Sequence, residues 1–366
     1  MEKQINRIHE VDGIRGWAAL VVLLFHTFGE MLKFAVPNAH SSWLTPVLSG
    51  NIAVLVFFVL SGDALSSGYF SGGGYRVIDR LLVRRYFRLT IPILMSCLIT
   101  YFIMFIGWDY HKEASVILQR PDWLGKYLQF KGSIYYFLRY SLIGVYVSHT
   151  IENSYNPFLW TMSIEMAGSM LVFLICYIWG RLRNPQFLCI GLIVFFTTIG
   201  SFFSLFFAGV LFGYFRKKGY LDKLLLQNQY QYFAFFIVLF IAAVLITSAD
   251  IYPSAAIFPP KKIIAMILVF CFYTQRHLKY FFSNKLSQFL GEISFPLYLV
   301  HFQVLISLMS WLIVKDYSIK GVIDPDAMLK IGCITVAISL LVAWCFRYIE
   351  RIVWKKVDFF VLKVLS

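Results

Sequence analysis

Long apolar stretches alternate with short polar segments along almost the whole of this chain. About 20 apolar residues in a helix are needed to cross the hydrocarbon core of a bilayer, and stretches of roughly that length recur here. The pattern predicts an all-α integral membrane protein of about ten transmembrane helices, built as a single domain over residues 1–366. The expected spans are 13–35, 50–69, 86–107, 157–180, 187–199, 201–215, 231–248, 259–275, 288–314 and 328–347.

Three parts of this pattern need comment. The short spans 187–199 and 201–215 are either a tight helical hairpin around Gly200 or one broken helix. The aromatic run 133–147, in the longest connection, is typical of an interfacial or re-entrant helix. The first apolar run continues past His26, which is too long for the core of a cleavable signal, so we expect it to be the first span.

Composition supports the membrane class. Hydrophobic residues make up 59% of the chain and charged residues 14%, whereas a soluble domain has about 25% charged residues. A net charge of +14 could indicate a nucleic-acid partner, but the basic residues lie mostly in short connections. Of the 33 Lys and Arg residues, 22 fall on the side of the N-terminus and 11 on the other. This bias predicts cytoplasmic termini and no nucleic acid, although Lys261 and Lys262 run against it.

All six cysteines lie inside apolar runs, and none forms a CxxC pair. We interpret them as small packing residues rather than as metal ligands or disulfide partners.

Ionisable residues inside a span are costly and therefore mark candidate sites. Arg15 and His26 share one face of the first span, with His26 about 16 Å deeper in the membrane. An imidazole at that depth is suited to take up a proton near neutral pH. The alternative is a structural histidine that is hydrogen-bonded to a neighbouring helix.

A basic cluster, Arg84, Arg85 and Arg88, lies at the inner end of the third span. Arg85 and Arg88 share a helix face, and guanidinium groups bind phosphate in a bidentate manner. The cluster is therefore either a phosphate site or a lipid-headgroup contact.

A third set of polar residues belongs to spans 157–180 and 288–314. Glu165 and His301 lie at comparable depths, about 12 Å and 20 Å from the ends of their spans. Ser294 and Tyr298 share a helix face with His301, and Trp160 and Thr161 stand at the entry of the Glu165 helix. We expect one polar pocket that contains these residues.

Five motifs, in order, resemble the acyltransferase-3 superfamily of membrane acyltransferases. They are the run DGIRGWAALVVLLFH with Arg15 eleven positions before His26, the run VFFVLSG at 56–62, the RxxR motif of Arg85 and Arg88, the run LWT with Glu165 at 159–165, and the run SFPLYLVH at 294–301. Asp63 departs from the pattern, because an apolar or aromatic residue usually follows the Ser-Gly pair. The esterase-like domain that is fused to some members is not present in this sequence.

The resemblance implies ten helices with cytoplasmic termini. It also implies acyl-CoA as the donor, most commonly acetyl-CoA, with no metal. His26 would be catalytic and would be assisted by Glu165, and Arg15, Arg85 and Arg88 would hold the donor. The pocket would comprise Trp160, Thr161, Ser294, Tyr298 and His301. The implied reaction is O-acetyl transfer to a carbohydrate or lipid-linked glycan at the outer face of a bacterial inner membrane. The sequence leaves open whether copies associate as a homo-oligomer.

Two other functions remain open from the sequence. A proton-coupled secondary transporter could use the same intramembrane His and Glu residues, although we find no inverted repeat. A different class of membrane acyltransferase also uses an intramembrane His, but its second motif is not evident.

The charge bias generates a prediction about topology. A reporter that is active only in the cytoplasm should be active when fused after Ser366, because most basic residues lie on the side of the termini. Activity of a periplasmic reporter at the same junction would contradict the orientation and, with it, donor entry from the cytoplasm.

Overall fold

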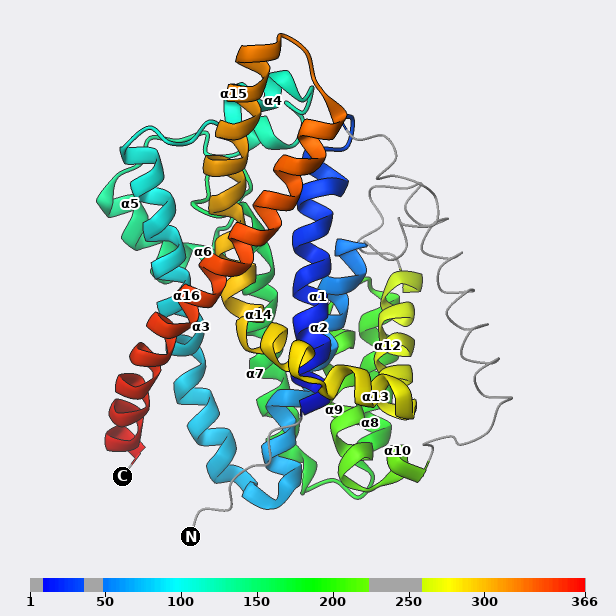
Figure 1. The fold of residues 1–366 in the computed structure, drawn as a ribbon. Coiled ribbons are helices and arrows are strands. Elements are labelled where there is room, and N and C mark those ends of the chain that lie inside the picture. The colour runs from blue at the N-terminus through cyan, green and yellow to red at the C-terminus, as the bar shows by residue number, and fades with distance from the viewer. Residues whose placement is uncertain (1–8, 36–48, 224–258, 366) are drawn as a thin grey trace.

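The computed structural model describes residues 9–35, 49–223 and 259–365, and within them every regular element is a helix (Figure 1). The helices are α1 (His9–Leu24), α2 (Gly50–Gly68), α3 (Gly74–Phe105), α4 (His111–Ile117), α5 (Ile134–Arg139), α6 (Val145–Val147), α7 (Thr161–Trp179), α8 (Pro185–Thr198), α9 (Phe203–Lys217), α10 (Tyr220–Lys223), α12 (Pro259–Thr274), α13 (Arg276–Ser283), α14 (Lys285–Val304), α15 (Ser310–Lys320) and α16 (Pro325–Leu365). π-Helical turns include η1 (Phe25–Met31) and η8 (Leu305–Met309), and a 3₁₀ turn η6 (Pro157–Trp160) precedes α7.

The predicted all-α class is confirmed in this part of the chain. Span 231–248 lies outside the described residues, and helices occupy the other nine predicted spans. Among the described residues, five helical segments are long and apolar enough to cross a membrane: His9–Met31, Gly50–Phe105, Pro157–Trp179, Lys285–Lys320 and Pro325–Trp354. The number of spans and the orientation stay predictions. α1 begins and α16 ends at the same end of the bundle (Figure 1).

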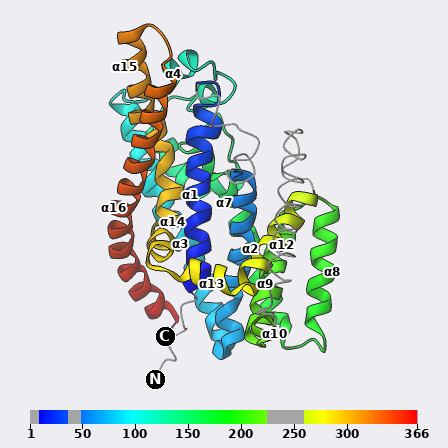
Figure 2. The same ribbon diagram turned by 45° about the vertical axis from the view of Figure 1, so that its right-hand side comes forward.

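Helix α1 lies in the middle of the bundle and packs closely against α14 (Figures 1 and 2). The close approach depends on glycine. A Cβ atom on Gly16 would collide with the backbone at Leu290 and Gly291, and one on Gly291 would collide with the carbonyl of Asp12. The two backbones therefore touch near the cytoplasmic end predicted for α1, and this contact fixes the position of Arg15.

A second close contact joins α2 to α9. A Cβ atom on Gly62 would collide with the carbonyl oxygen of Phe206, and one on Gly209 would collide with that of Val59. Figure 2 shows α8 on the outer side of α9, so α8 and α9 form the helical hairpin that the sequence left open. Gly200 makes the turn with a φ of 76°.

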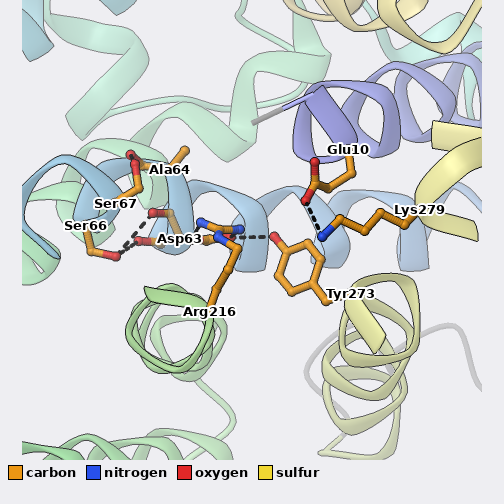
Figure 3. Close-up of polar contacts among 9 residues, drawn as sticks. Glu10, Asp63, Ala64, Ser66, Ser67, Arg216, Tyr273 and Lys279 are labelled. Carbon is orange, nitrogen blue, oxygen red and sulfur yellow. Dashed lines mark hydrogen bonds and ion pairs between the residues drawn. The ribbon is translucent and has the colours of Figure 1, made fainter. Parts of the chain in front are cut away.

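A buried polar triad joins α2, α9 and α12 (Figure 3). Asp63 is fully buried, and Arg216 holds both of its oxygens, at 2.6 Å and 2.5 Å. The hydroxyl of Tyr273 donates a third hydrogen bond to Asp63, at 2.5 Å. The residue that departs from the resemblance thus pairs with an arginine of α9, and a buried charge of this kind needs such compensation.

The structure also explains the exception to the charge bias. Lys261 and Lys262 are both buried in α12, and the ammonium of Lys262 donates to the carbonyl of Gly200 at the end of α8. These lysines are buried in the protein interior instead of lying in a solvent-exposed loop, so they carry little information about orientation.

The 133–147 run is helical and consists of α5, a π-helical turn and α6. The six cysteines are free thiols.

The α2–α9 contact generates a prediction. Gly209→Ala should lower stability by about 1–3 kcal/mol, because a methyl group there overpacks a backbone contact. Thermal unfolding of the purified protein in detergent measures the effect. Gly191→Ala on α8 is the matched control, since a Cβ atom there meets nothing within 4 Å. The control should be neutral or stabilising by up to about 1 kcal/mol through helix propensity. Equal effects at both positions would refute the assignment of a tight α2–α9 interface.

Candidate functional site

A cavity of about 300 Å³ lies between α1, α2, α3, α7, α14 and the last part of α16. Seven of the residues predicted to form the site line it: Arg15, Arg85, Arg88, Thr161, Glu165, Ser294 and Tyr298. These residues come from four helices and from positions up to 283 apart in the sequence. The wall therefore combines guanidinium, carboxylate and hydroxyl groups.

One side of the cavity is a buried ion pair between α3 and α7. The Arg85 side chain donates from Nη2 to Glu165, and from Nε to the hydroxyl of Ser169 at 2.7 Å. Ser169 in turn donates to the carbonyl of Glu165 at 2.5 Å. The charge of Arg85 is therefore largely neutralised within the protein. Glu165 is held by Arg85 and does not contact His26.

The other two arginines of the cavity are differently placed. Arg15 is half-buried and Arg88 is exposed. Within the described residues neither guanidinium forms a hydrogen bond or an ion pair, although the carboxylate of Glu350 lies in the same wall. Arg88 lies over the indole of Trp354, 5.9 Å from the ring centroid. Two guanidinium groups with free N–H donors in one cavity are suited to bind a phosphorylated ligand.

Tyr298 lies in the cavity wall and is hydrogen-bonded to the η6 turn. Its hydroxyl donates to the carbonyl of Phe158, and since that O–H has only one proton, Thr161 must donate to the tyrosine oxygen over 2.7 Å. The wall of the cavity is thereby connected through Tyr298 to the η6 turn. Beyond this turn lies the pair of histidines.

His26 lies in the π-helical turn η1, and such turns are frequent at functional sites. Its ring is stacked on Phe158 at a centroid distance of 4.0 Å and lies 5.5 Å from the ring of His301. Trp123 stacks nearby at 5.8 Å. His26 is half-buried, and its Nδ1 is buried without a hydrogen-bond partner among the described residues.

The tautomer of His301 follows from its contacts. Nδ1 lies 2.9 Å from the carbonyl of Leu297, and a carbonyl can only accept, so Nδ1 carries the proton. In the neutral ring Nε2 is then a lone-pair nitrogen, buried and without a hydrogen-bond partner in the described part of the chain. Together with His26, the site holds two buried imidazole nitrogens whose hydrogen-bonding capacity is unused.

Polar contacts fix the η6 turn that presents Phe158. Asn156 caps it, accepting from the Phe158 N–H at 3.1 Å and donating to the carbonyl of Leu299 at 3.0 Å. His149 donates from Nε2 to the carbonyl of Pro157 at 3.2 Å and accepts from Tyr140 at Nδ1 over 2.9 Å. Burial lowers the pKa of His149, which favours the neutral ring that can accept this bond.

A second buried ion pair adjoins the π-helical turn that carries His26. Arg120 is 4% exposed and donates to the side chain of Glu30 at 2.9 Å and to its carbonyl at 2.8 Å. Glu30 belongs to the same π-helical turn as His26. Arg120 also lies over Trp123, 5.7 Å from its ring centroid, so the pair fixes the aromatic ring that covers His26.

The structure divides the predicted site into two neighbouring compartments. Seven predicted residues line the charged cavity, whereas His26 and His301 lie together beyond Tyr298, within an aromatic environment. Trp160 is 36% exposed and faces Phe202, so it is not part of the cavity wall. Sequence reasoning missed Phe158 and Arg120. The Asn-Pro pair before Phe158, an N-cap followed by proline, was the available signal for the η6 turn.

Comparison with known proteins gives one match. A family model described as an acyltransferase domain, of the acyltransferase-3 family, matches residues 8–344. No curated protein and no solved structure matches the chain significantly.

The Arg85–Glu165 pair generates a prediction. Glu165→Ala should cost about 3 kcal/mol, because Arg85 would keep its charge in a buried position without a counter-ion. Replacing both residues, as Arg85→Met and Glu165→Met together, should recover most of the loss, since no buried charge then remains. Melting temperatures of the purified variants test this. Glu113→Ala, at an exposed position of α4, is the control and should be near neutral. A double variant as unstable as Glu165→Ala alone would contradict the interpretation.

Proposed function

The chain belongs to the acyltransferase-3 family, and from this premise we propose that it moves an acyl group from acyl-CoA to a hydroxyl of an acceptor. The observation that carries the proposal is the adjacency of an arginine-lined cavity and a buried pair of histidines, joined through Tyr298 and Phe158. A thioester donor with a phosphorylated end needs both kinds of environment. Acetyl-CoA is the proposed donor.

The donor phosphates are proposed to bind Arg15 and Arg88. Both line the cavity and have guanidinium donors that no protein acceptor occupies among the described residues. We propose a different role for Arg85 from the one expected from the sequence, because Glu165 and Ser169 already engage its guanidinium group. We assign it the role of holding the wall, together with Glu165, and assign direct phosphate contact to the other two arginines.

His26 is proposed as the general base. In the transfer step its lone-pair nitrogen takes the proton of the acceptor hydroxyl, and the hydroxyl oxygen attacks the thioester carbonyl carbon. The carbon–sulfur bond breaks as the new ester forms, and the imidazolium returns the proton to the departing thiolate. Atoms and charge balance without a metal or a covalent acyl-enzyme. Aromatic neighbours exclude water, which would otherwise hydrolyse the thioester.

His301 is proposed as a positioning residue for His26. Its ring lies 5.5 Å from that of His26, and its Nδ1 is tied to the carbonyl of Leu297. Because Phe158 stacks on both rings, a small movement of the η6 turn would alter access from the cavity to His26. The carbonyl of Phe158 is bound to Tyr298, so a ligand that contacts Tyr298 could drive that movement.

The acceptor is proposed to be a carbohydrate or lipid-linked glycan that reaches His26 from the side of Trp123, which the charge bias assigns to the outer face of the inner membrane.

The alternative function, a proton-coupled transporter, has less support. A relay would require Glu165 and His26 to exchange a proton, but Glu165 is held by Arg85 and contacts the other compartment.

The proposed base generates a prediction. His26→Ala should lower acyl transfer by about 10² to 10⁴, the usual cost of removing a general base. His26→Gln should fail as well, because an amide cannot take up the proton. Donor binding should survive both changes, since Arg15 is about 16 Å away along the helix. Transfer of labelled acetyl groups to total glycan and calorimetric donor binding are the two measurements.

His301→Ala is the companion variant for this experiment. A positioning role predicts a partial loss of rate with donor binding unchanged, smaller than the loss in His26→Ala. Near-normal transfer by His26→Gln, combined with complete loss in His301→Ala, would identify His301 as the base instead.

A further inference from the structure

A second cavity, of about 350 Å³, lies beside the first between α3, α14 and α16. Three residues line both cavities: Arg88, Glu292 and Glu350. The two spaces are therefore neighbours that share these three side chains in their walls.

The second cavity is basic and contains one indole. Four arginines and two glutamates line it together with Trp354: Arg84, Arg88, Arg347, Arg351, Glu292 and Glu350. Glu292 pairs with Arg347 and, at 3.3 Å, with Arg351. The side chain of Arg351 remains 53% exposed.

Trp354 is held in a fixed orientation. Its indole N–H donates to Glu350, one turn earlier on α16, at 3.1 Å. Arg88 approaches the same ring, with 5.9 Å between the guanidinium carbon and the ring centroid. An aromatic ring that is held in a basic cavity is a stacking platform for a flat ring that carries a phosphate.

The α16 residues of this cavity fall outside the matched family region. The match ends at residue 344, whereas Arg347, Glu350, Arg351 and Trp354 lie on the continuation of α16. In this chain α16 runs on to Leu365, past the point where it crosses α3 (Figure 1). The α16 wall of the second cavity thus lies beyond the matched region, whereas Arg84, Arg88 and Glu292 lie within it.

We propose that the second cavity binds the 3′-phosphoadenosine end of the donor, with the adenine stacked on Trp354 and the 3′-phosphate held by Arg351 and Arg88. The inference rests on the proposed acyl-CoA donor and names the part of it that this extension recognises. The remainder of the donor then runs past Arg88 into the first cavity, toward Tyr298. The walls that the two cavities share fit this path.

The phosphate group bound by these arginines could also be the phosphodiester of a lipid headgroup, so the test separates the two sources. Full-length protein is placed in nanodiscs of phosphatidylcholine, with and without phosphatidylglycerol, and titrated with coenzyme A and with 3′-dephospho-coenzyme A in a calorimeter. The wild-type protein should bind coenzyme A about 10-fold to 100-fold more tightly than the dephospho form, since charge-assisted hydrogen bonds are lost with the phosphate. The preference should be present in both lipid compositions.

Two variants test the assigned residues. Arg351→Ala should abolish most of the preference while leaving affinity for 3′-dephospho-coenzyme A unchanged. Trp354→Leu should weaken both ligands by the same factor, and Trp354→Phe should restore much of the loss because a ring remains. Arg183→Ala is the control: Arg183 is an exposed arginine in the turn between α7 and α8, and its loss should change nothing.

The outcomes are distinguishable. Equal affinity of the wild-type protein for both ligands would overturn the subsite and leave the proposed donor intact. Binding of neither ligand would overturn the donor and the subsite together. A preference that Arg351→Ala does not alter would refute the role of this residue. If phosphatidylglycerol removes the preference and Arg351→Ala removes that lipid effect, the cavity is a headgroup site and the proposal is wrong.

Discussion

The backbone contact between α1 and α14 is the constraint on which the site depends. Gly16 and Gly291 allow the two helices to touch without intervening side chains. In a membrane, packing of this kind replaces the hydrophobic effect as the main force between helices. The contact sets the separation of the helices that carry Arg15, His26 and His301, so the charged cavity and the histidine pair are both built on one rigid unit.

The division into a charged compartment and an aromatic compartment has an electrostatic logic. Arginines near the end of the bundle retain access to water and can bind an anion without the full cost of desolvation. The histidines lie among Phe158 and Trp123, where the local dielectric is low and each interaction with a reacting group is stronger. A ligand that spans both environments can be held at one end and react at the other.

The sequence predicted the helices well, because a bilayer imposes one length and one composition on each span. Seven of the ten site residues predicted from the sequence line one cavity, because the depth and the helix face of a residue follow from residue counting. The hydrogen-bond and ion-pair partners of these side chains could not be derived by residue counting. The resemblance implied that Glu165 would assist His26, but the partner of a carboxylate depends on the direction of its side chain, and Glu165 reaches Arg85. The π-helical turn at His26 was also outside the reach of a pattern based on 3.6 residues per turn.

The Asp63 triad has a consequence for the stability of the bundle. Asp63 is fully enclosed, and Arg216 and Tyr273 are directed at it from two other helices. Loss of the carboxylate alone would strand a guanidinium inside the bundle, and loss of Arg216 alone would strand the carboxylate. Either single loss leaves a buried charge without its counter-ion, so the carboxylate and the arginine 153 residues further along the chain depend on each other for the stability of the bundle.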